Sequence, residues 1–192
     1  MKKLVLFMHV SLDGFVAGPG GEMDWIKADD EMFDLAGQRT RVADTALYGR
    51  VTYQMMESFW PTADEQPNPS KHVREHAPWY RKVKKVVVSR SMAGEQRPNT
   101  EIIGDKLAER VRALKQQEGE EIVMFGSPSV SHALMREQLI DEYWLFVNPM
   151  VLGKGIPLFS DVKTAFKLQL VKNVAFASGV VCLHYRQEGA AK

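Results

Sequence analysis

Three short segments place glycine, serine or arginine directly after an apolar run, where these residues could contact a phosphate. They are residues 49–52 (GRVT), 89–90 (SR) and 126–130 (GSPSV). Glycine leaves room for a ligand to approach the backbone closely. The N-terminus of a helix presents free N–H groups and the positive end of its dipole, and arginine can pair with a phosphate through two parallel hydrogen bonds. These residue types predict a site for the phosphates of a nucleotide cofactor.

The flanking residues indicate that each segment follows a strand. Residues 122–125 (IVMF) form a buried strand, after which Ser127 is expected to cap a helix and Pro128 to occupy its first position. Residues 43–48 and 84–89 are two further strands. Ligands of open α/β sheets bind at the carboxyl ends of the strands. The three segments together therefore predict a dinucleotide site, in which Arg90 would pair with a 2′-phosphate and favour NADPH over NADH.

Each segment also has a plain structural interpretation, in which Gly49 and Gly126 are turn residues and Arg90 is a solvated strand end. Only the combination of the three segments favours a cofactor site. The chain has no GxGxxG after its first strand and no Walker lysine motif, so phosphoryl transfer has no support. The five histidines show no metal-binding spacing. His72 and His76 are four residues apart, but they fall in a segment, 61–79, that is interpreted as a solvated surface excursion.

The order of the predicted elements indicates the fold class. Strands at 3–10, 43–48, 84–89, 100–103, 121–125 and 143–150 alternate with helical patterns until about residue 140. Residues 166–170 and 179–186 then look like an antiparallel pair. This order predicts an α/β fold, with a mostly parallel mixed sheet covered by helices on both faces and antiparallel strands at its edge. We expect a single domain over residues 1–188 and a frayed tail at 189–192.

The composition is that of an ordinary globular enzyme or binding protein. Hydrophobic residues make up 45% of the 192 residues, charged residues make up 26%, and the formal net charge is +1. This balance predicts neither a nucleic acid nor a membrane as partner. The apolar N-terminus is interpreted as a strand, so we expect a cytoplasmic protein. The single cysteine, Cys182, excludes an internal disulfide and is expected to be a buried thiol.

Five sequence blocks between residues 11 and 159 carry a resemblance to a known family, and the resemblance covers roughly residues 2–186. They are SLDGFVA (11–17), GRVTY (49–53), VVVSR (86–90), FGSPSV (125–130) and DEYWLFVNPMVLGKGIPLF (141–159). With them the chain resembles the reductase domain of the bifunctional riboflavin-biosynthesis deaminase–reductase, which shares its fold with dihydrofolate reductase. The resemblance implies a dihydrofolate-reductase-like three-layer α/β/α fold, a homodimer, and NADPH-dependent reduction of a pyrimidine or pterin-like heterocycle.

The resemblance also implies roles for individual residues in binding NADPH. Gly49, Arg50 and Thr52 would meet the cofactor phosphates, Ser89 and Arg90 the adenosine ribose and its 2′-phosphate, Gly126, Ser127, Pro128, Ser129 and Val130 the pyrophosphate, and Val16 and Ala17 the nicotinamide. The chain departs from the family in two ways. It has Gly126–Ser127 where the family usually has two glycines, and it lacks the cysteines of the zinc-dependent deaminase partner.

Two acidic residues are candidates for supplying the proton that must accompany hydride transfer. Asp30 follows Trp25 by five residues, the spacing at which dihydrofolate reductase places its substrate-binding carboxylate, but Asp30 could equally be a helix cap. Asp13 ends the first strand, beside the expected nicotinamide, but an Asp-Gly pair is also a common turn. Trp25 either covers the substrate or fills the core.

The expected function is therefore NADPH-dependent reduction of a small nitrogen heterocycle. The most specific expectation is an activity like that of 5-amino-6-(5-phosphoribosylamino)uracil reductase. A dihydrofolate or pterin reductase is the enzymatic alternative and depends on Asp30. A non-catalytic nucleotide-binding regulatory protein is the alternative of another class, and Ser127 in the glycine turn keeps it open.

Overall fold

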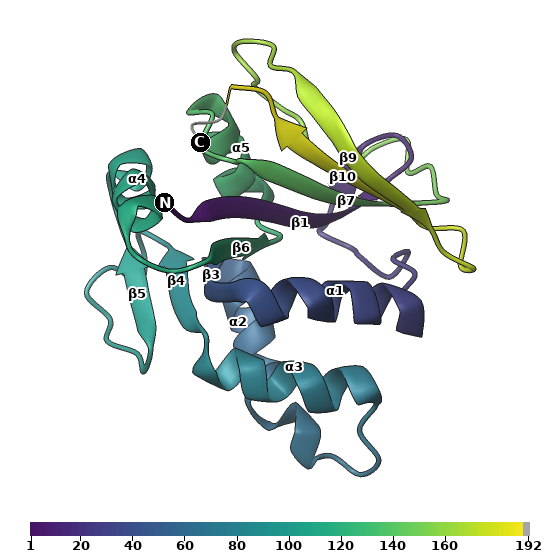
Figure 1. The fold of residues 1–192 in the computed structure, drawn as a ribbon, viewed down its shortest axis with the longest axis horizontal. Coiled ribbons are helices and arrows are strands. Elements are labelled where there is room, and N and C mark those ends of the chain that lie inside the picture. The colour runs from purple at the N-terminus through teal and green to yellow at the C-terminus, as the bar shows by residue number, and fades with distance from the viewer. Residues whose placement is uncertain (190–192) are drawn as a thin grey trace.

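One eight-stranded sheet runs through the molecule in the order β5-β4-β3-β6-β1-β7-β10-β9 (Figure 1). The computed structural model describes residues 1–189. The strands are β1 (Lys3–Ser11), β3 (Ala43–Gly49), β4 (Lys84–Val88), β5 (Thr100–Ile103), β6 (Glu121–Phe125), β7 (Glu142–Asn148), β9 (Leu168–Ala175) and β10 (Val181–Gln187). The strands from β5 to β7 in this order pair in parallel, and β10 is antiparallel to β7 and β9. The predicted mixed sheet is confirmed.

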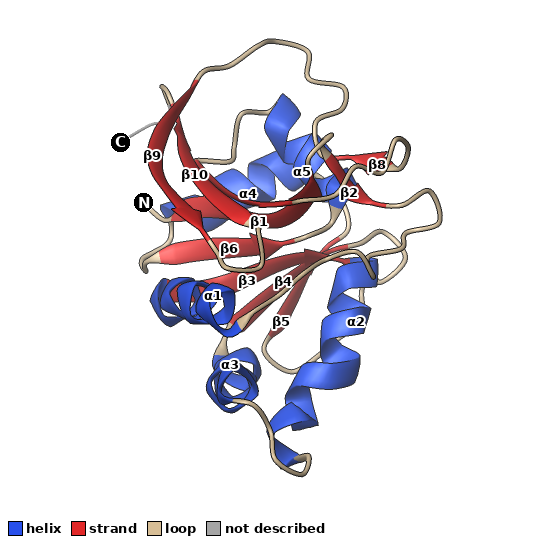
Figure 2. Cartoon of the chain, turned by 90° about the vertical axis from the view of Figure 1, so that its right-hand side faces the viewer, coloured by secondary structure: helices blue, strands red, loops and turns tan. Residues whose placement is uncertain are grey.

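Helices cover both faces of this sheet, which gives the three layers expected of a dihydrofolate-reductase-like fold (Figure 2). On one face lie α1 (Asp30–Val42), α2 (Arg50–Phe59), the 3-10 helix η1 (Trp60–Glu65) and α3 (Lys71–Lys82); on the other lie α4 (Leu107–Gln116) and α5 (Pro128–Arg136). A small ribbon, β2 (Phe15–Ala17) with β8 (Ile156–Pro157), lies outside the main sheet.

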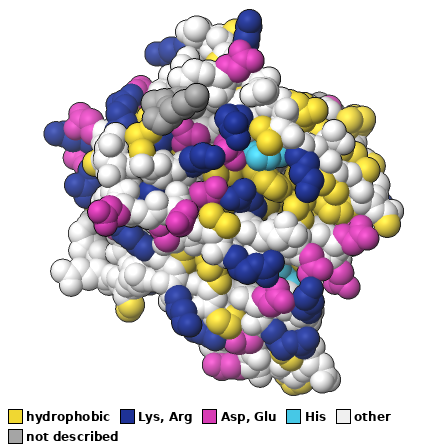
Figure 3. Space-filling view, viewed as in Figure 1, with side chains coloured by type: hydrophobic (Ala, Val, Ile, Leu, Met, Phe, Trp, Pro, Cys, Tyr) yellow, Lys and Arg dark blue, Asp and Glu magenta, His cyan; other side chains and the backbone are white. Residues whose placement is uncertain are grey.

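The alternation of side chains along β1 explains why the strand lies at the centre. Leu4 and Leu6 point into the apolar core beneath α4 and α5, whereas Val5 and Phe7 point into the core beneath α1, α2 and α3. A strand that is apolar on both sides is stable only where both faces are covered. None of the described helices covers β7, β10 and β9 on the α1 face, and apolar side chains are visible there (Figure 3).

The predicted surface excursion at 61–79 was wrong. Residues of this segment form η1 and most of α3, which begins after Ser70, whose Oγ accepts the Val73 N–H at 3.3 Å. The helix is polar overall and contains Pro78, so composition indicated a loop. Packing decides the outcome instead, because Tyr80 and Ala77 are fully buried.

The interpretation of His72 and His76 as a solvated pair was also wrong for His76. Only 8% of His76 is exposed, and its ring lies 4.2 Å from that of Trp60 and 4.8 Å from that of Trp79. Burial, with a further contribution from His72, lowers the pKa of His76 to about 3. The imidazole is therefore a neutral part of the packing between α3 and η1.

The C-terminal pair differs from the prediction at its first strand. β9 begins at Leu168 and continues to Ala175, with a bulge opposite His184 and Tyr185. Most of β9 is exposed, so the alternation that would mark its full length is weak. Cys182 on β10 is buried as predicted, and burial raises the pKa of its thiol to about 12. Except for residue 189, the predicted tail at 189–192 lies outside the described residues.

Candidate functional site

The predicted phosphate-binding residues follow neighbouring strands at one edge of the sheet. β3 lies between β4 and β6, and all three are parallel. Gly49 is paired with Val88, so Ser89 follows directly beside the end of β3. Gly126 follows the end of β6, the other neighbour of β3. Sequence positions almost 80 residues apart thus meet at adjacent strand ends, as the prediction requires.

The starts of α2 and α5 are in direct contact. A Cβ atom at Gly49 would lie 1.9 Å from Ser127 Oγ and 3.3 Å from Val130 Cγ2. One at Gly126 would lie 3.4 Å from Thr52 Oγ1, and the Thr52 and Ser127 hydroxyl oxygens are 3.4 Å apart. We refer to these five residues as the two-helix cradle. Its shape depends on the missing side chain of Gly49, because almost any other residue would collide with Ser127.

The cradle is electrostatically suited to an anion. Gly49 and Ser127 are the N-cap residues of α2 and α5, and neither helix has a side-chain hydrogen bond at its cap. The first N–H groups of α2 have no partner within the helix. In the first turn of α5, Pro128 has no N–H and the Val130 N–H is bonded to the Ser127 carbonyl, so Ser129 offers the free N–H. Two positive dipole ends converge here. The cradle itself contains no carboxylate.

Ser127 does not cap α5 in the predicted way. Its backbone is left-handed, with φ of 64°, and its hydroxyl approaches Thr52 instead of the first turn of α5. The Ser127 carbonyl accepts the N–H groups of Val130 and Ser131 at 3.0 and 2.9 Å. The left-handed conformation turns the side chain away from the helix that it was expected to cap. Ser127 is only 8% exposed.

Basic side chains lie at the rim of this edge. Arg90 is exposed, and its guanidinium has no hydrogen bond or ion pair within residues 1–189. Arg50 is exposed and donates to Gln54 Oε1 at 3.1 Å. Ser89 is buried, and its Oγ accepts the Met92 N–H at 3.3 Å, which orders the turn that carries Arg90. Arg90 is therefore available to an anionic ligand.

Asp13 joins two loops. Its Oδ1 accepts from the Ser11 hydroxyl at 2.6 Å and from the Leu152 N–H at 3.2 Å, and its Oδ2 accepts from the Gly153 N–H at 2.7 Å. The hydrogen bond from the Ser11 hydroxyl lowers the pKa of Asp13; desolvation opposes it, and the Gly153 and Leu152 N–H groups lower the pKa further. The side chain is thus held as a carboxylate, with its hydrogen-bond capacity directed at the protein.

The β2–β8 ribbon holds Val16 and Ala17 beside α5. Val16 is buried in the core beneath α4 and α5, and a Cβ atom at Gly155 would lie 2.2 Å from the Ala17 carbonyl oxygen. His132 on α5 forms a 2.9 Å hydrogen bond through Nε2 with the Pro157 carbonyl of β8. The helix that begins at the cradle is therefore linked to the ribbon that carries Val16 and Ala17.

Asp30 and Trp25 are not joined to the cradle by any contact found within residues 1–189. Asp29, not Asp30, is the N-cap of α1, and its Oδ1 accepts the Met32 N–H at 2.8 Å. Asp30 is the exposed first residue of the helix. Trp25 is half-buried, and its Nε1 donates to the Glu22 carbonyl at 3.1 Å.

Two polar residues that the sequence analysis did not select lie at the ends of β1 and β7. Asn148 has no exposed surface and links β7, β1 and the loop before α1. His9 is half-buried and stacks on Phe146, with ring centroids 5.1 Å apart, and burial lowers its pKa to about 4. The available signal was a polar residue near the carboxyl end of each strand, since His9 lies two residues before the end of β1 and Asn148 is the last residue of β7.

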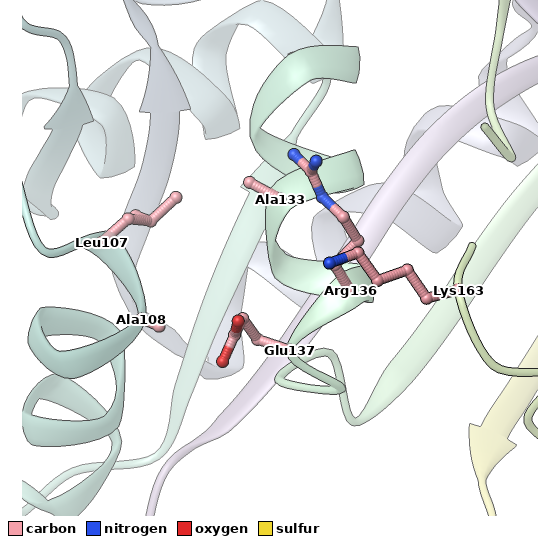
Figure 4. A pocket seen from close by; sticks show the side chains of 6 residues that line it. All are labelled: Leu107, Ala108, Ala133, Arg136, Glu137 and Lys163. Atoms are coloured by element: carbon pink, nitrogen blue, oxygen red, sulfur yellow. The ribbon is translucent and has the colours of Figure 1, made fainter. Parts of the chain in front are cut away.

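A separate cavity of about 310 Å³ lies between α4, α5 and the chain near Lys163 (Figure 4). It is lined by Leu107, Ala108, Ala133, Arg136, Glu137 and Lys163. No predicted site residue lines it. Within the described residues, no three His, Cys, Asp or Glu side chains gather as metal ligands would, and the helices of residues 1–189 include none long and apolar enough to cross a membrane.

Comparisons with known proteins agree with this architecture. The chain is 34% identical over 190 residues to the uncharacterized protein YyaP of Bacillus subtilis (strain 168), covering 98% of this chain and 96% of YyaP. Among solved structures, a putative riboflavin biosynthesis protein from Shewanella sp. PV-4 aligns with a TM-score of 0.71 at 20% identity, covering 97% of this chain and 99% of that one.

The fold is also that of dihydrofolate reductase. The Enterococcus faecalis enzyme, solved as a complex with NADP(H) and RAB-propyl, aligns with a TM-score of 0.62 at 13% identity, covering 97% of this chain and 96% of that one. Residues 2–182 match the family described as the RibD C-terminal domain. This match extends over nearly all of the sheet and both helical layers, so the chain belongs to the RibD C-terminal domain family.

Proposed function

We propose that this protein is an NADPH-dependent reductase of a small nitrogen heterocycle. The observation that carries the proposal is the two-helix cradle, where two uncapped helix N-termini meet around Gly49. Such a pair of termini suits the diphosphate of a dinucleotide, because backbone N–H groups and dipoles favour negative charge there. Family membership and the NADP(H) complex of dihydrofolate reductase support the same cofactor.

The residues of the site fit NADPH. Neither Gly49 nor Gly126 carries a side chain between the two helix starts, and Thr52, Ser127 and Ser129 supply hydroxyl groups there. Arg90 and Arg50 lie at the rim, where Arg90 would pair with a 2′-phosphate. The cofactor, when bound, supplies a hydride; this chain's residues bind its phosphates and position the reacting ring near Val16 and Ala17.

For the substrate we propose a pyrimidine of the type reduced in riboflavin biosynthesis, 5-amino-6-(5-phosphoribosylamino)uracil or its precursor. The family supports this class. We retain Asp30 and Asp13 as candidate proton donors and Trp25 as a candidate cover for the ring. Asp30 is exposed and free of hydrogen bonds within residues 1–189, whereas Asp13 is occupied by the 152–153 loop. The side chain of Asp30 is thus the freer of the two to meet a substrate.

Titration of the protein with NADPH and with NADH, followed by the fluorescence of its four tryptophans, tests the cofactor. We expect tighter binding of NADPH; equal affinities would remove the role of Arg90. NADPH oxidation should then be compared with an aminopyrimidine substrate and with dihydrofolate. Oxidation with dihydrofolate alone would favour the pterin reductase. Tight binding of NADPH without turnover of either compound would favour a regulatory protein.

We further propose that the protein is a cytoplasmic homodimer. Apolar side chains lie over the uncovered part of the sheet (Figure 3), and Leu170 and Val171 on the edge strand β9 are 48% and 44% exposed. An edge strand with exposed apolar residues is a common site of association between copies. Light scattering during size-exclusion chromatography should give twice the chain mass, and Leu170→Lys should reduce it to the monomer mass.

A further inference from the structure

We propose that His9 is a substrate-contacting residue, whose neutral imidazole donates a hydrogen bond from Nε2 to a carbonyl oxygen of the heterocycle. This inference rests on the proposed function and specifies the substrate's chemistry. It follows from the hydrogen bonds of Asn148, from the tautomer that they impose on His9, and from the surroundings of the ring.

The backbone fixes the orientation of the Asn148 amide. The Lys27 N–H donates to Oδ1 at 2.9 Å, so this atom must be the oxygen. Nδ2 faces the Phe146 carbonyl at 3.0 Å and the Val10 carbonyl at 3.4 Å, and both can only accept. A rotated amide would place an N–H against the Lys27 N–H and an oxygen against two carbonyls. Asn148 is fully buried, so water cannot compensate for that arrangement.

The oriented amide determines the tautomer of His9. The Asn148 Nδ2 lies 3.5 Å from His9 Nδ1, and the amide nitrogen can only donate. A proton on Nδ1 would point at the hydrogens of this amide, so we assign Nδ1 as the unprotonated nitrogen and place the ring proton on Nε2. The low pKa that burial gives His9 keeps the ring neutral at pH 7, so it presents one N–H and no charge.

The Nε2 atom is free to meet a ligand. It has no hydrogen-bond partner within residues 1–189, and it keeps some surface that is accessible to solvent. His9 extends the row of Val5 and Phe7 on the α1 side of β1. Phe7 pairs with Phe125, the last residue of β6, after which the chain enters the cradle. His9 lies two residues further along β1, beyond the end of β6. The donor is thus next to the strand end that leads into the proposed cofactor site.

The surroundings of His9 favour a flat ring. Phe146 stacks on the imidazole, Phe7 lies 4.5 Å from Phe146, and Phe125 lies 5.5 Å from Phe7. Phe125 is half-buried, so part of this aromatic row is accessible. A neutral donor beside aromatic faces suits an uncharged heterocycle with an exocyclic oxygen. A protonated diaminopyrimidine would require an acceptor, which His9 does not offer here.

Nitrogen-15 NMR of the histidine side chains tests the tautomer directly. We expect the His9 signals of the Nε2–H form between pH 6 and 8 in the free protein. Addition of 2,4-dioxopteridine, an oxygen-bearing planar probe, should move the His9 Nε2–H signal and leave Nδ1 unprotonated. Signals of the Nδ1–H form, or of a charged ring at pH 7, would overturn the proposal.

Three variants separate donation from packing. His9→Phe retains an aromatic ring without a donor, His9→Gln retains an N–H donor, and His72→Gln is a matched control on α3. We expect His9→Phe to weaken binding of 2,4-dioxopteridine about tenfold and His9→Gln to weaken it less than about threefold. The control should bind as the wild type does. Equal losses in the Phe and Gln variants would contradict donation by His9.

The same titrations distinguish failure of this inference from failure of the proposed function. NADP⁺ binding should be unchanged in both His9 variants, because His9 is not part of the cradle. Absence of NADP⁺ binding in the wild type would reject the proposed cofactor, while the response of His9 to 2,4-dioxopteridine alone would still decide the donor role. Failure of the wild type to bind 2,4-dioxopteridine, with NADP⁺ present or absent, would reject the substrate class.

Discussion

The two sides of the carboxyl edge of the sheet are organised by different means. On the β3/β6 side, the two-helix cradle exists because atoms are missing: Gly49 and Gly126 carry no side chain, so the two helix starts approach closely, and no side chain caps either helix. On the β1/β7 side, side chains supply the order, since Asn148 and Asp13 bind backbone groups of segments far apart in the sequence. The β3/β6 side therefore has backbone groups without hydrogen-bond partners, whereas most polar groups named on the β1/β7 side already have partners within the protein.

This difference indicates how the two proposed ligands would be recognised. A diphosphate brings many acceptors, so the unpaired N–H groups and dipoles of two helix starts are sufficient. A small heterocycle brings few polar atoms, so the protein must fix the direction of each donor in advance. Changes on the β1/β7 side should therefore affect folding and substrate binding together, whereas changes in the cradle should act mainly on the cofactor.

The largest effect is expected from Asn148→Ala. The change leaves the Lys27 N–H and the Phe146 and Val10 carbonyls without their buried partner, which we expect to cost about 3 kcal/mol of stability. Urea unfolding followed by circular dichroism would measure the loss. Asn173→Ala on the exposed face of β9 is the control and should change stability by less than about 0.5 kcal/mol. Similar losses in both variants would mean that Asn148 does not organise this side.

Acid should weaken the β1/β7 side through His9. The unfolded chain takes up a proton at His9 near pH 6.5, but the folded chain resists until about pH 4, so stability falls as the pH falls through this window. At pH 5 the wild type should have lost about 2 kcal/mol more than His9→Gln, relative to pH 7.5. His76 is present in both proteins, so its titration cancels in the difference. Parallel stability curves from pH 7.5 to 5 would show that His9 is not held neutral.

Gly49→Ala tests whether the cradle depends on the absence of a side chain at residue 49. The backbone at residue 49 is ordinary, with φ of −84°, so any effect comes from the collision of the new Cβ with Ser127 and Val130. We expect a loss of about 1.5 kcal/mol in stability and weaker NADPH binding. Adding Ser127→Gly removes the nearest atom and should recover much of both. Additive effects in the double variant, measured by calorimetry, would show that the two residues do not compete for one space.

The sequence predicted the cradle better than the β1/β7 side for a physical reason. Gly49, Gly126 and Ser127 lie at the ends of apolar strands or directly after them, and Thr52 follows within the first turn of α2, so local patterns place them at this edge. The importance of Asn148 depends on β7 lying beside β1, about 140 residues away along the chain, and on the loop at Lys27. No local pattern contains that information.

The errors at Ser127 and α3 have the same origin. Serine before proline is a good helix cap by propensity, but the left-handed turn after β6 directs the hydroxyl to Thr52. The segment of α3 has the composition of a loop, yet burial of Tyr80 and His76 against the sheet and η1 makes it a helix. In both places tertiary contacts decide between local alternatives, so the sheet could be predicted from the sequence but these details could not.

Arg90→Gln should give the smallest effect and the most specific one. Arg90 is exposed and has no ion pair within residues 1–189, so its loss should leave the unfolding midpoint unchanged. It should raise the Kd of NADPH about tenfold and leave that of NADH unchanged, because only the 2′-phosphate would be lost as a partner. The difference should shrink at high salt, as expected for an exposed charge pair. Arg112→Gln removes a surface arginine paired with Glu137 and is the control. If Arg90→Gln weakened both dinucleotides equally, the side chain would contact a part that they share, and cofactor preference would have to arise within the cradle itself.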